Sequence, residues 1–248
     1  MQAEIFVGAL TVSAAGGFMS LDRTAAFQTM VSRPIVAGPV TGYLLSNIEA
    51  GLVSGMLLEL LFIGDLPVGA YLPAHETALT VLVTALTAVM LGAVGSAVSA
   101  GAGAFYAGPA FKALPIALVI AAPFGRVYKL ADDAARRVNY SMYKRAEEII
   151  EKGHDISLFK ENLKGALVFF SLTAAALFVT CLPLMYAAHF LAGRREWSIS
   201  PALYPAFFGV LALGISASYN AAYGTRASLA AFLVAGAAPA VALAVLTR

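Results

Sequence analysis

The sequence predicts an all-α polytopic integral membrane protein. Of its 248 residues, 60% are hydrophobic and only 12% are charged, whereas charged residues make up about 25% of an average soluble domain. The mean hydropathy is +0.82. A soluble fold of this size could not bury so much apolar surface, so we expect lipid around much of the chain. The net charge of only +2 gives no reason to expect a nucleic acid as partner.

Eight apolar runs define the expected membrane elements. A simple spanning helix needs about 20 apolar residues, and several runs reach that length. Two early runs are shorter, which is typical of re-entrant or broken segments that are buried in protein or line a wet cavity. Folds with such segments often contain inverted repeats, which this sequence allows although none is visible in it. The runs are Ile5–Met19, Pro34–Ser46, Leu52–Gly64, Ala78–Val98, Pro109–Phe124, Ala166–Leu191, Pro201–Ala217 and Leu229–Thr247.

A charged segment divides the chain into three parts. Residues 126–164 hold nine of the 16 Lys and Arg residues and seven of the 14 Asp and Glu residues. We expect a cytoplasmic amphipathic hairpin there, because loops rich in Lys and Arg tend to be cytoplasmic. Residues 1–125 are then an amino-terminal membrane half with the functional site, and residues 165–248 a carboxy-terminal membrane half. The hairpin is either a solvated or interfacial amphipathic helix or a docking surface for a soluble partner.

The hairpin pattern also predicts which face of its first helix is apolar. Small and apolar residues recur there at helical spacing. The predicted apolar face consists of Val127, Leu130, Ala131, Ala134 and Val138.

Ionisable residues inside the amino-terminal half are candidate site residues, because each costs at least about 2.5–3.5 kcal/mol at membrane depth. Glu59 is either a hydrogen-bond acceptor for a polar substrate or a structural anchor paired with Arg23 or Arg33. Asp65 is a substrate contact or a helix cap. His75 and Glu76 form a membrane-edge loop or contact the substrate. A metal role is the least expected, because the His-Glu pair lacks metal-ligand spacing.

The polar stretch LDRTAAFQTMVSRP interrupts two apolar runs. It contains Asp22 and Gln28, with Arg23 and Arg33 beside them. The amide of Gln28 both donates and accepts hydrogen bonds, and a carboxylate with an amide suits sugar hydroxyls, which need both kinds of partner. The alternative is a polar loop with a helix cap at Asp22.

Other functional classes have weaker support. No Walker-type phosphate loop is present, so ATP-driven transport by this chain alone is not expected, and neither is any cofactor. An intramembrane serine enzyme would need more than Ser54-Gly55 and His189. An ion-coupled secondary transporter, with Glu59 as the proton site, stays open.

The stretch from Ser20 to Ala78 resembles the amino-terminal half of the mannose/fructose/sorbose-family enzyme IIC component of the bacterial phosphotransferase system (PTS). The pattern is an acidic residue, then Gln, then Arg-Pro, then a Gly-rich segment leading into Gly-x-x-Leu-Glu and a second glycine segment. The matching positions are Asp22, Gln28, Arg33, Pro34, Gly42, Gly55, Glu59, Gly64, Gly69 and Ala70.

This resemblance implies a sugar permease subunit in the bacterial cytoplasmic membrane. It implies a mannose-type hexose as substrate, a membrane IID partner, soluble IIA and IIB phosphocarriers, and a trimer of IIC–IID heterodimers. Phosphoryl transfer would belong to the partners, so this chain would carry no phosphohistidine. The chain departs from the family pattern at Pro67 and at His75-Glu76, which motivates a second hypothesis, a IIC-like regulatory subunit without transport.

Overall fold

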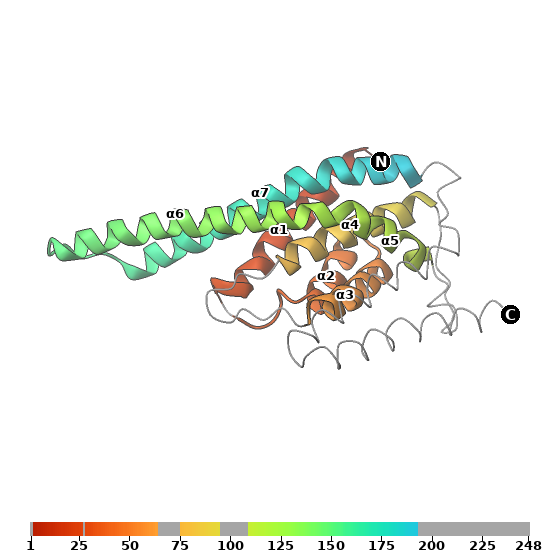
Figure 1. The fold of residues 1–248 in the computed structure, drawn as a ribbon. Coiled ribbons are helices and arrows are strands. Elements are labelled where there is room, and N and C mark those ends of the chain that lie inside the picture. Colours follow the sequence, from red (N-terminus) through yellow and green to blue (C-terminus); the bar gives the residue numbers. More distant parts are fainter. Residues whose placement is uncertain (1, 27, 64–74, 95–108, 193–248) are drawn as a thin grey trace.

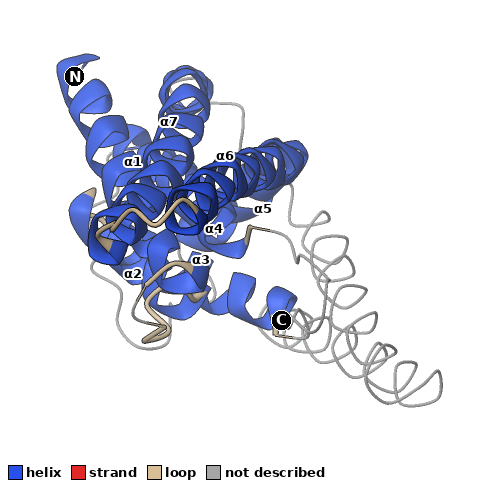
Figure 2. Ribbon diagram, turned by 90° about the vertical axis from the view of Figure 1, so that its left-hand side faces the viewer, coloured by secondary structure: helices blue, strands red, loops and turns tan. Residues whose placement is uncertain are grey.

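The computed structural model describes residues 2–26, 28–63, 75–94 and 109–192, and this part of the chain is helical without any strand. Helix α7 contacts α1, α4 and α6, and α2 pairs with α3, as Figures 1 and 2 show. The all-α prediction is confirmed. The elements are α1 (Gln2–Thr24), α2 (Pro34–Leu44), α3 (Ile48–Phe62), α4 (Glu76–Val94), α5 (Pro109–Ala121), the 3-10 turn η2 (Ala122–Phe124), α6 (Gly125–Glu151) and α7 (Leu158–Ala192).

Three helical stretches are long and apolar enough to cross a membrane: residues 2–23, 113–151 and 158–192. The first is α1, the second runs from α5 through η2 into α6, and the third is α7. Helix α4 is a shorter apolar helix at the centre of the core, where Leu82 and Leu86 are fully buried. Because it is apolar on all sides, it is enclosed by protein.

The two short early runs form a tight helical hairpin, α2–α3. At about 1.5 Å per residue, helices of 11 and 15 residues are too short to cross a hydrocarbon core of about 30 Å. Glycines let the two backbones touch. A Cβ atom on Gly38 would lie 2.5 Å from the Gly51 carbonyl oxygen, and one on Gly55 would lie 2.6 Å from the Pro34 carbonyl oxygen. Small residues permit this close approach.

Helices α6 and α7 run side by side and antiparallel, and together they extend beyond the other helices (Figure 1). The face of α6 predicted to be apolar lies outside the core, since Val127, Leu130 and Val138 are exposed. Tyr128 and Asp132 are buried instead. Their polar groups find partners on α7 and α1, and those contacts turn this face of α6 inward.

Some predicted features lie outside the described residues. Asp65 is one of them, and so is everything after Ala192, including most of the predicted carboxy-terminal half.

Candidate functional site

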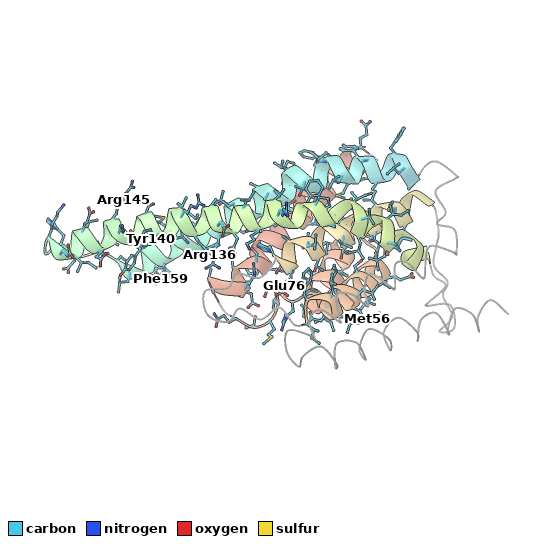
Figure 3. The ribbon with its side chains drawn as sticks, viewed as in Figure 1. Met56, Glu76, Arg136, Tyr140, Arg145 and Phe159 are labelled. Carbon is cyan, nitrogen blue, oxygen red and sulfur yellow. The ribbon has the colours of Figure 1, made fainter. Side chains whose placement is uncertain are left out.

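Polar side chains gather where three pieces of the amino-terminal half meet. These pieces are the loop between α1 and α2, the last turn of α3 and the first turn of α4. We call this cluster the polar junction. It consists of Asp22, Ser32, Arg33, Glu59, Glu76 and Thr77, and Figure 3 labels Glu76 within it.

Arg33 lies between two carboxylates. Its Nη1 atom is 3.7 Å from Glu59 Oε1 and 3.7 Å from Glu76 Oε2. The side chains of Arg33, Glu59 and Glu76 are 21%, 19% and 12% exposed, so the group is partly accessible from outside the protein. At 3.7 Å the contacts are ion pairs without a direct hydrogen bond, which leaves donor capacity on Arg33 for a ligand. Of the two arginines predicted as partners of Glu59, the structure places Arg33 beside it.

Glu59 also completes the start of α2. The backbone N–H of Ile35 donates to Glu59 Oε2 at 3.3 Å. This N–H belongs to the first turn of α2, which begins with Pro34 after the cap residue Arg33. First-turn N–H groups have no partner inside the helix, and the helix dipole favours a negative charge there. The carboxylate of Glu59 therefore fixes the end of α3 against the start of α2.

Asp22 organises the loop. Its Oδ1 accepts hydrogen bonds from the N–H and the hydroxyl of Thr29, the latter at 2.8 Å. Its Oδ2 accepts from the N–H and the hydroxyl of Ser32, at 3.2 and 3.3 Å. The residue is 6% exposed. Because both oxygens accept hydrogen bonds from loop residues, Asp22 holds in place the loop that carries Arg33.

The loop backbone holds an uncommon conformation. Gln28 and Met30 have φ angles of +53° and +68°, which are uncommon for residues other than glycine. Such angles cost of order 1–3 kcal/mol each and cluster at functional sites. Both side chains are exposed, so the amide of Gln28 can meet a ligand. The hydroxyl of Thr77 donates to the Ser32 carbonyl oxygen at 2.7 Å and ties the loop to α4.

His75 caps α4 instead of lining an open site. Its Nδ1 accepts from the Ala78 N–H at 3.3 Å, and its ring packs edge-on against Tyr128, with 6.4 Å between the ring centroids. It is 3% exposed. Burial, and then the nearby charge of Arg23, lower the pKa of His75 to about 3. The imidazole is therefore neutral at physiological pH.

Arg23 belongs to a second, buried charge cluster. Its Nη1 lies 3.6 Å from Asp132 Oδ2, and Arg136 Nε lies 3.6 Å from the same oxygen. The side chains of Arg23 and Asp132 are 9% and 6% exposed. This cluster ties the last turn of α1, next to Asp22, to α6.

The structure offers little for metal or serine chemistry. No three His, Cys, Asp or Glu side chains group as a metal site among the described residues. The hydroxyl of Ser54 is buried, without a hydrogen-bond partner in that part of the chain, so no base activates it there.

Sequence reasoning missed several residues of this region. Thr29 and Ser32 donate to Asp22, and Thr77 donates to the Ser32 carbonyl oxygen 45 positions before it. Composition reveals none of these contacts. Asp132 could have been found from the sequence, because Tyr128, Asp132 and Ala135 recur at helical spacing and define a second face of α6. The neighbouring face is more apolar and was chosen instead.

The polar junction suits a polyhydroxylated ligand. The carboxylates of Glu59 and Glu76 accept hydrogen bonds from hydroxyl groups, and the guanidinium of Arg33 donates to hydroxyl oxygens. The exposed amide of Gln28 can do both.

Comparisons with known proteins agree with this arrangement. The model of the PTS system sorbose-specific IIC component family matches residues 5–198. The solved structure of the mannose transporter ManYZ in complex with a microcin is similar in fold, with a TM-score of 0.50 and 14% identity, over 98% of this chain and 79% of that one. No curated protein matches the sequence significantly. The predicted family is confirmed: the chain belongs to the sorbose-specific IIC family of the phosphotransferase system, whose members are multi-pass membrane permease subunits.

Proposed function

We propose that this chain is the IIC subunit that binds and translocates a mannose-type hexose in a bacterial cytoplasmic membrane. In this proposal a IID subunit accompanies it in the membrane, in a trimer of IIC–IID heterodimers. Separate IIA and IIB proteins carry the phosphoryl group to the sugar. The hairpin of residues 126–164 faces the cytoplasm.

The observation that carries the proposal is the accessible Arg33 between Glu59 and Glu76 at the ends of short helices. An ionised group held at membrane depth typically faces a partner or a cavity, and short interrupted helices are typical of substrate sites in transporters. Here two carboxylates share one guanidinium, each 3.7 Å away. A carboxylate oxygen can accept more than one hydrogen bond, so the Glu59 oxygens, which contact Arg33 and the Ile35 N–H, can also accept from sugar hydroxyls.

The roles of the predicted site residues divide in this proposal. Glu59, Glu76 and Gln28 contact the sugar, and Arg33 both contacts it and holds the carboxylates. Asp22 shapes the loop, and His75 fixes the start of α4. Asp65 remains a proposed contact that lies outside the described residues.

Calorimetry on the chain co-purified with its IID subunit tests the proposal. Mannose, fructose, sorbose, glucose and N-acetylated hexosamines would be titrated in turn. We expect saturable binding of at least one hexose, weakened by Gln28→Ala as well as by Glu59→Gln. If a well-folded complex binds none of these sugars, the proposal is wrong.

Two further assays separate the alternative hypotheses in that case. Uptake that stops on adding an uncoupler and needs no phosphocarrier would indicate an ion-coupled transporter. A complex that neither binds nor transports sugar, but changes the activity of another transport system, would indicate a regulatory subunit.

A further inference from the structure

The last turn of α1 makes contacts on two sides. Asp22 accepts four hydrogen bonds there from the loop that carries Arg33. The next residue, Arg23, places its Nη1 atom 3.6 Å from Asp132 Oδ2 on α6. Adjacent residues of a helix point about 100° apart, so this turn holds the loop on one side and contacts α6 on another. A shift of Asp132 therefore reaches the loop through a single helical turn.

The start of α4 meets the same side of α6. His75 precedes Glu76, the first residue of α4, and its ring packs edge-on against the Tyr128 ring. Tyr128 and Asp132 are four residues apart, so they project from one side of α6, about 6 Å apart along its axis. Both are buried. This side of α6 thus contacts the neighbour of Glu76 as well as the neighbour of Asp22.

Helix α7 holds Tyr128 in place. The Thr180 hydroxyl oxygen lies 2.7 Å from the Tyr128 hydroxyl oxygen. Thr180 also donates to the carbonyl oxygens of Ala176 and Leu177, at 2.9 and 3.1 Å. Because carbonyl oxygens only accept, the Thr180 proton points toward them, and Tyr128 is the donor in the hydrogen bond between the two hydroxyls. The Tyr128 ring is therefore fixed at its hydroxyl end while it packs against His75.

Helix α7 also holds Asp132, through Arg136, which Figure 3 labels. Arg136 Nε lies 3.6 Å from the same Asp132 oxygen that faces Arg23. The Arg136 guanidinium lies over the Phe169 ring of α7, 5.8 Å from its centroid, and a cation at this distance is attracted to the ring. Two chains of contacts therefore run from α7 through α6, one to Arg23 and one to His75.

The buried ion pair contributes more to position than to stability. The desolvation of two charges offsets much of the attraction between Arg23 and Asp132. Their atoms are 3.6 Å apart, which is beyond hydrogen-bond distance. A buried charge is nevertheless costly wherever it lacks a partner, so the pair restricts where the end of α1 can lie against α6.

We propose that Asp132 and Tyr128 are positioning residues of the sugar site. Asp132 sets the place of the loop that carries Gln28 and Arg33, and Tyr128 sets the place of Glu76. Together they fix the separation of groups that contact the sugar, since binding groups depend on a supporting layer of packed side chains for their geometry. The inference rests on the proposed function, because that proposal makes the polar junction a sugar site.

Hexose calorimetry on the IID-bound chain tests the positioning role of Asp132. Asp132→Asn keeps the shape of the side chain and removes its charge. We expect it to weaken hexose binding at least about fivefold, the lower end of the usual coupling between separate sites. Asp133→Asn is the matched control, because it makes the same chemical change one residue further along α6, on a side about 100° away. It should leave the affinity unchanged.

Tyr128 is tested with two substitutions. Tyr128→Leu removes the ring that packs against His75 and should weaken hexose binding at least about fivefold. Tyr128→Phe keeps the ring, and it leaves no unsatisfied group on Thr180, whose hydroxyl still donates to carbonyl oxygens. Tyr128→Phe should therefore retain most of the affinity.

A double-mutant cycle separates positioning from general destabilisation. If Asp132 acts through the loop, Asp22→Asn releases that loop already, and Asp132→Asn has little left to change. The loss of binding free energy in the double variant should then be smaller than the sum of the two single losses. Two independent structural effects would give additive losses, which would overturn the inference.

Amide exchange gives a readout that needs no sugar. Asp132→Asn should accelerate exchange several-fold in residues 28–33, and Tyr128→Leu should do so in residues 78–82, because each segment loses its support on α6. If Asp132→Asn does not fold, the double variant Arg23→Met/Asp132→Leu takes its place, because it removes both charges of the buried pair.

The outcomes for the positioning role and for the proposed function can be told apart. If wild type binds hexose and both Asp132→Asn and Tyr128→Leu bind it as tightly as Asp133→Asn does, only the positioning role is wrong. Unchanged amide exchange in both segments would also overturn that role. If the wild-type complex binds no hexose, the proposed function is wrong, and amide exchange alone decides whether α6 holds the two segments.

Discussion

The glycine contact between α2 and α3 permits a sharp test, the substitution Gly51→Ala. A Cβ atom at this position would lie 2.5 Å from the Gly38 carbonyl oxygen and 2.9 Å from Pro39 Cα. Both atoms are backbone or held by it, so no side-chain rotation relieves the overlap. Ordinary contact begins at 3.4 Å, and the helices must therefore separate by about 0.9 Å.

Two opposing effects set the size of the change. Alanine stabilises a helix interior by about 0.5–1 kcal/mol relative to glycine. Overpacking of a close-packed interface costs typically about 1–3 kcal/mol, and contact with rigid backbone falls at the upper end of that range. We expect net destabilisation of about 1–2 kcal/mol, and weaker sugar binding, because Arg33 and Glu59 lie on opposite sides of this interface.

The assay is thermal unfolding in detergent, with sugar calorimetry on the same samples. Gly92→Ala is the matched control, because a Cβ atom on this helical glycine meets no atom of the described residues within 4 Å. Gly51→Ala should lower the melting temperature by several degrees, while Gly92→Ala should leave it unchanged or raise it. Equal melting temperatures for both variants would show that the two helices do not pack as described.

Three further predictions concern the surroundings of the site. Asp22→Asn replaces acceptor lone pairs by donors that face N–H and hydroxyl groups, so amide exchange of residues 25–33 should accelerate at least tenfold; unchanged exchange would contradict the positioning role. Arg23→Met should destabilise the protein by up to about 3–5 kcal/mol and the double variant Arg23→Met/Asp132→Leu by less, because the single variant leaves the buried Asp132 carboxylate with only the partly exposed Arg136 as partner; additive losses in thermal unfolding would refute this. His75, with its lowered pKa, contributes stability that is present above pH 6.5 and is lost as the pH falls toward 3. The stability advantage of wild type over His75→Asn should therefore shrink between pH 6.5 and 4, and a constant difference would mean that the imidazole is not buried.

Much of the architecture could be predicted from the sequence, because it depends on quantities that composition expresses. The membrane class followed from hydropathy, and the short helices α2 and α3 followed from the lengths of their apolar runs. The charged segment 126–164 coincides with α6 and the start of α7. The family followed from residue types and order between Ser20 and Ala78.

The site was only partly predictable, because pairing depends on distances in three dimensions. Glu59 and Arg33 stood out as charges in apolar surroundings, and two alternatives for Glu59 were open. The structure is compatible with both alternatives, since Glu59 forms an ion pair with Arg33 and is still partly exposed. The partner of Arg23 is Asp132, 109 positions further along the chain, and no local pattern links the two.

The buried face of α6 was not predicted, for a related reason. Hydrophobic periodicity identifies the most apolar side of a helix, and in water that side is the buried one. Beside a membrane-spanning α7, apolar side chains such as Leu130 can face lipid, whereas polar ones such as Tyr128 and Asp132 need partners inside the protein. The rule that assigns core faces in soluble helices is thus reversed at this position.

The central claim is that the carboxylate of Glu59 binds sugar. The most direct test is the ratio of hexose dissociation constants between Glu59→Gln and wild type, measured by calorimetry on the IID-bound chain. Glu49→Gln is the matched control, since it neutralises a carboxylate of the same helix outside the polar junction. A hydrogen bond to a charged group contributes about 1.5–3 kcal/mol, so we predict an affinity at least tenfold weaker for Glu59→Gln and unchanged for Glu49→Gln. Equal affinities of Glu59→Gln and wild type would contradict the account.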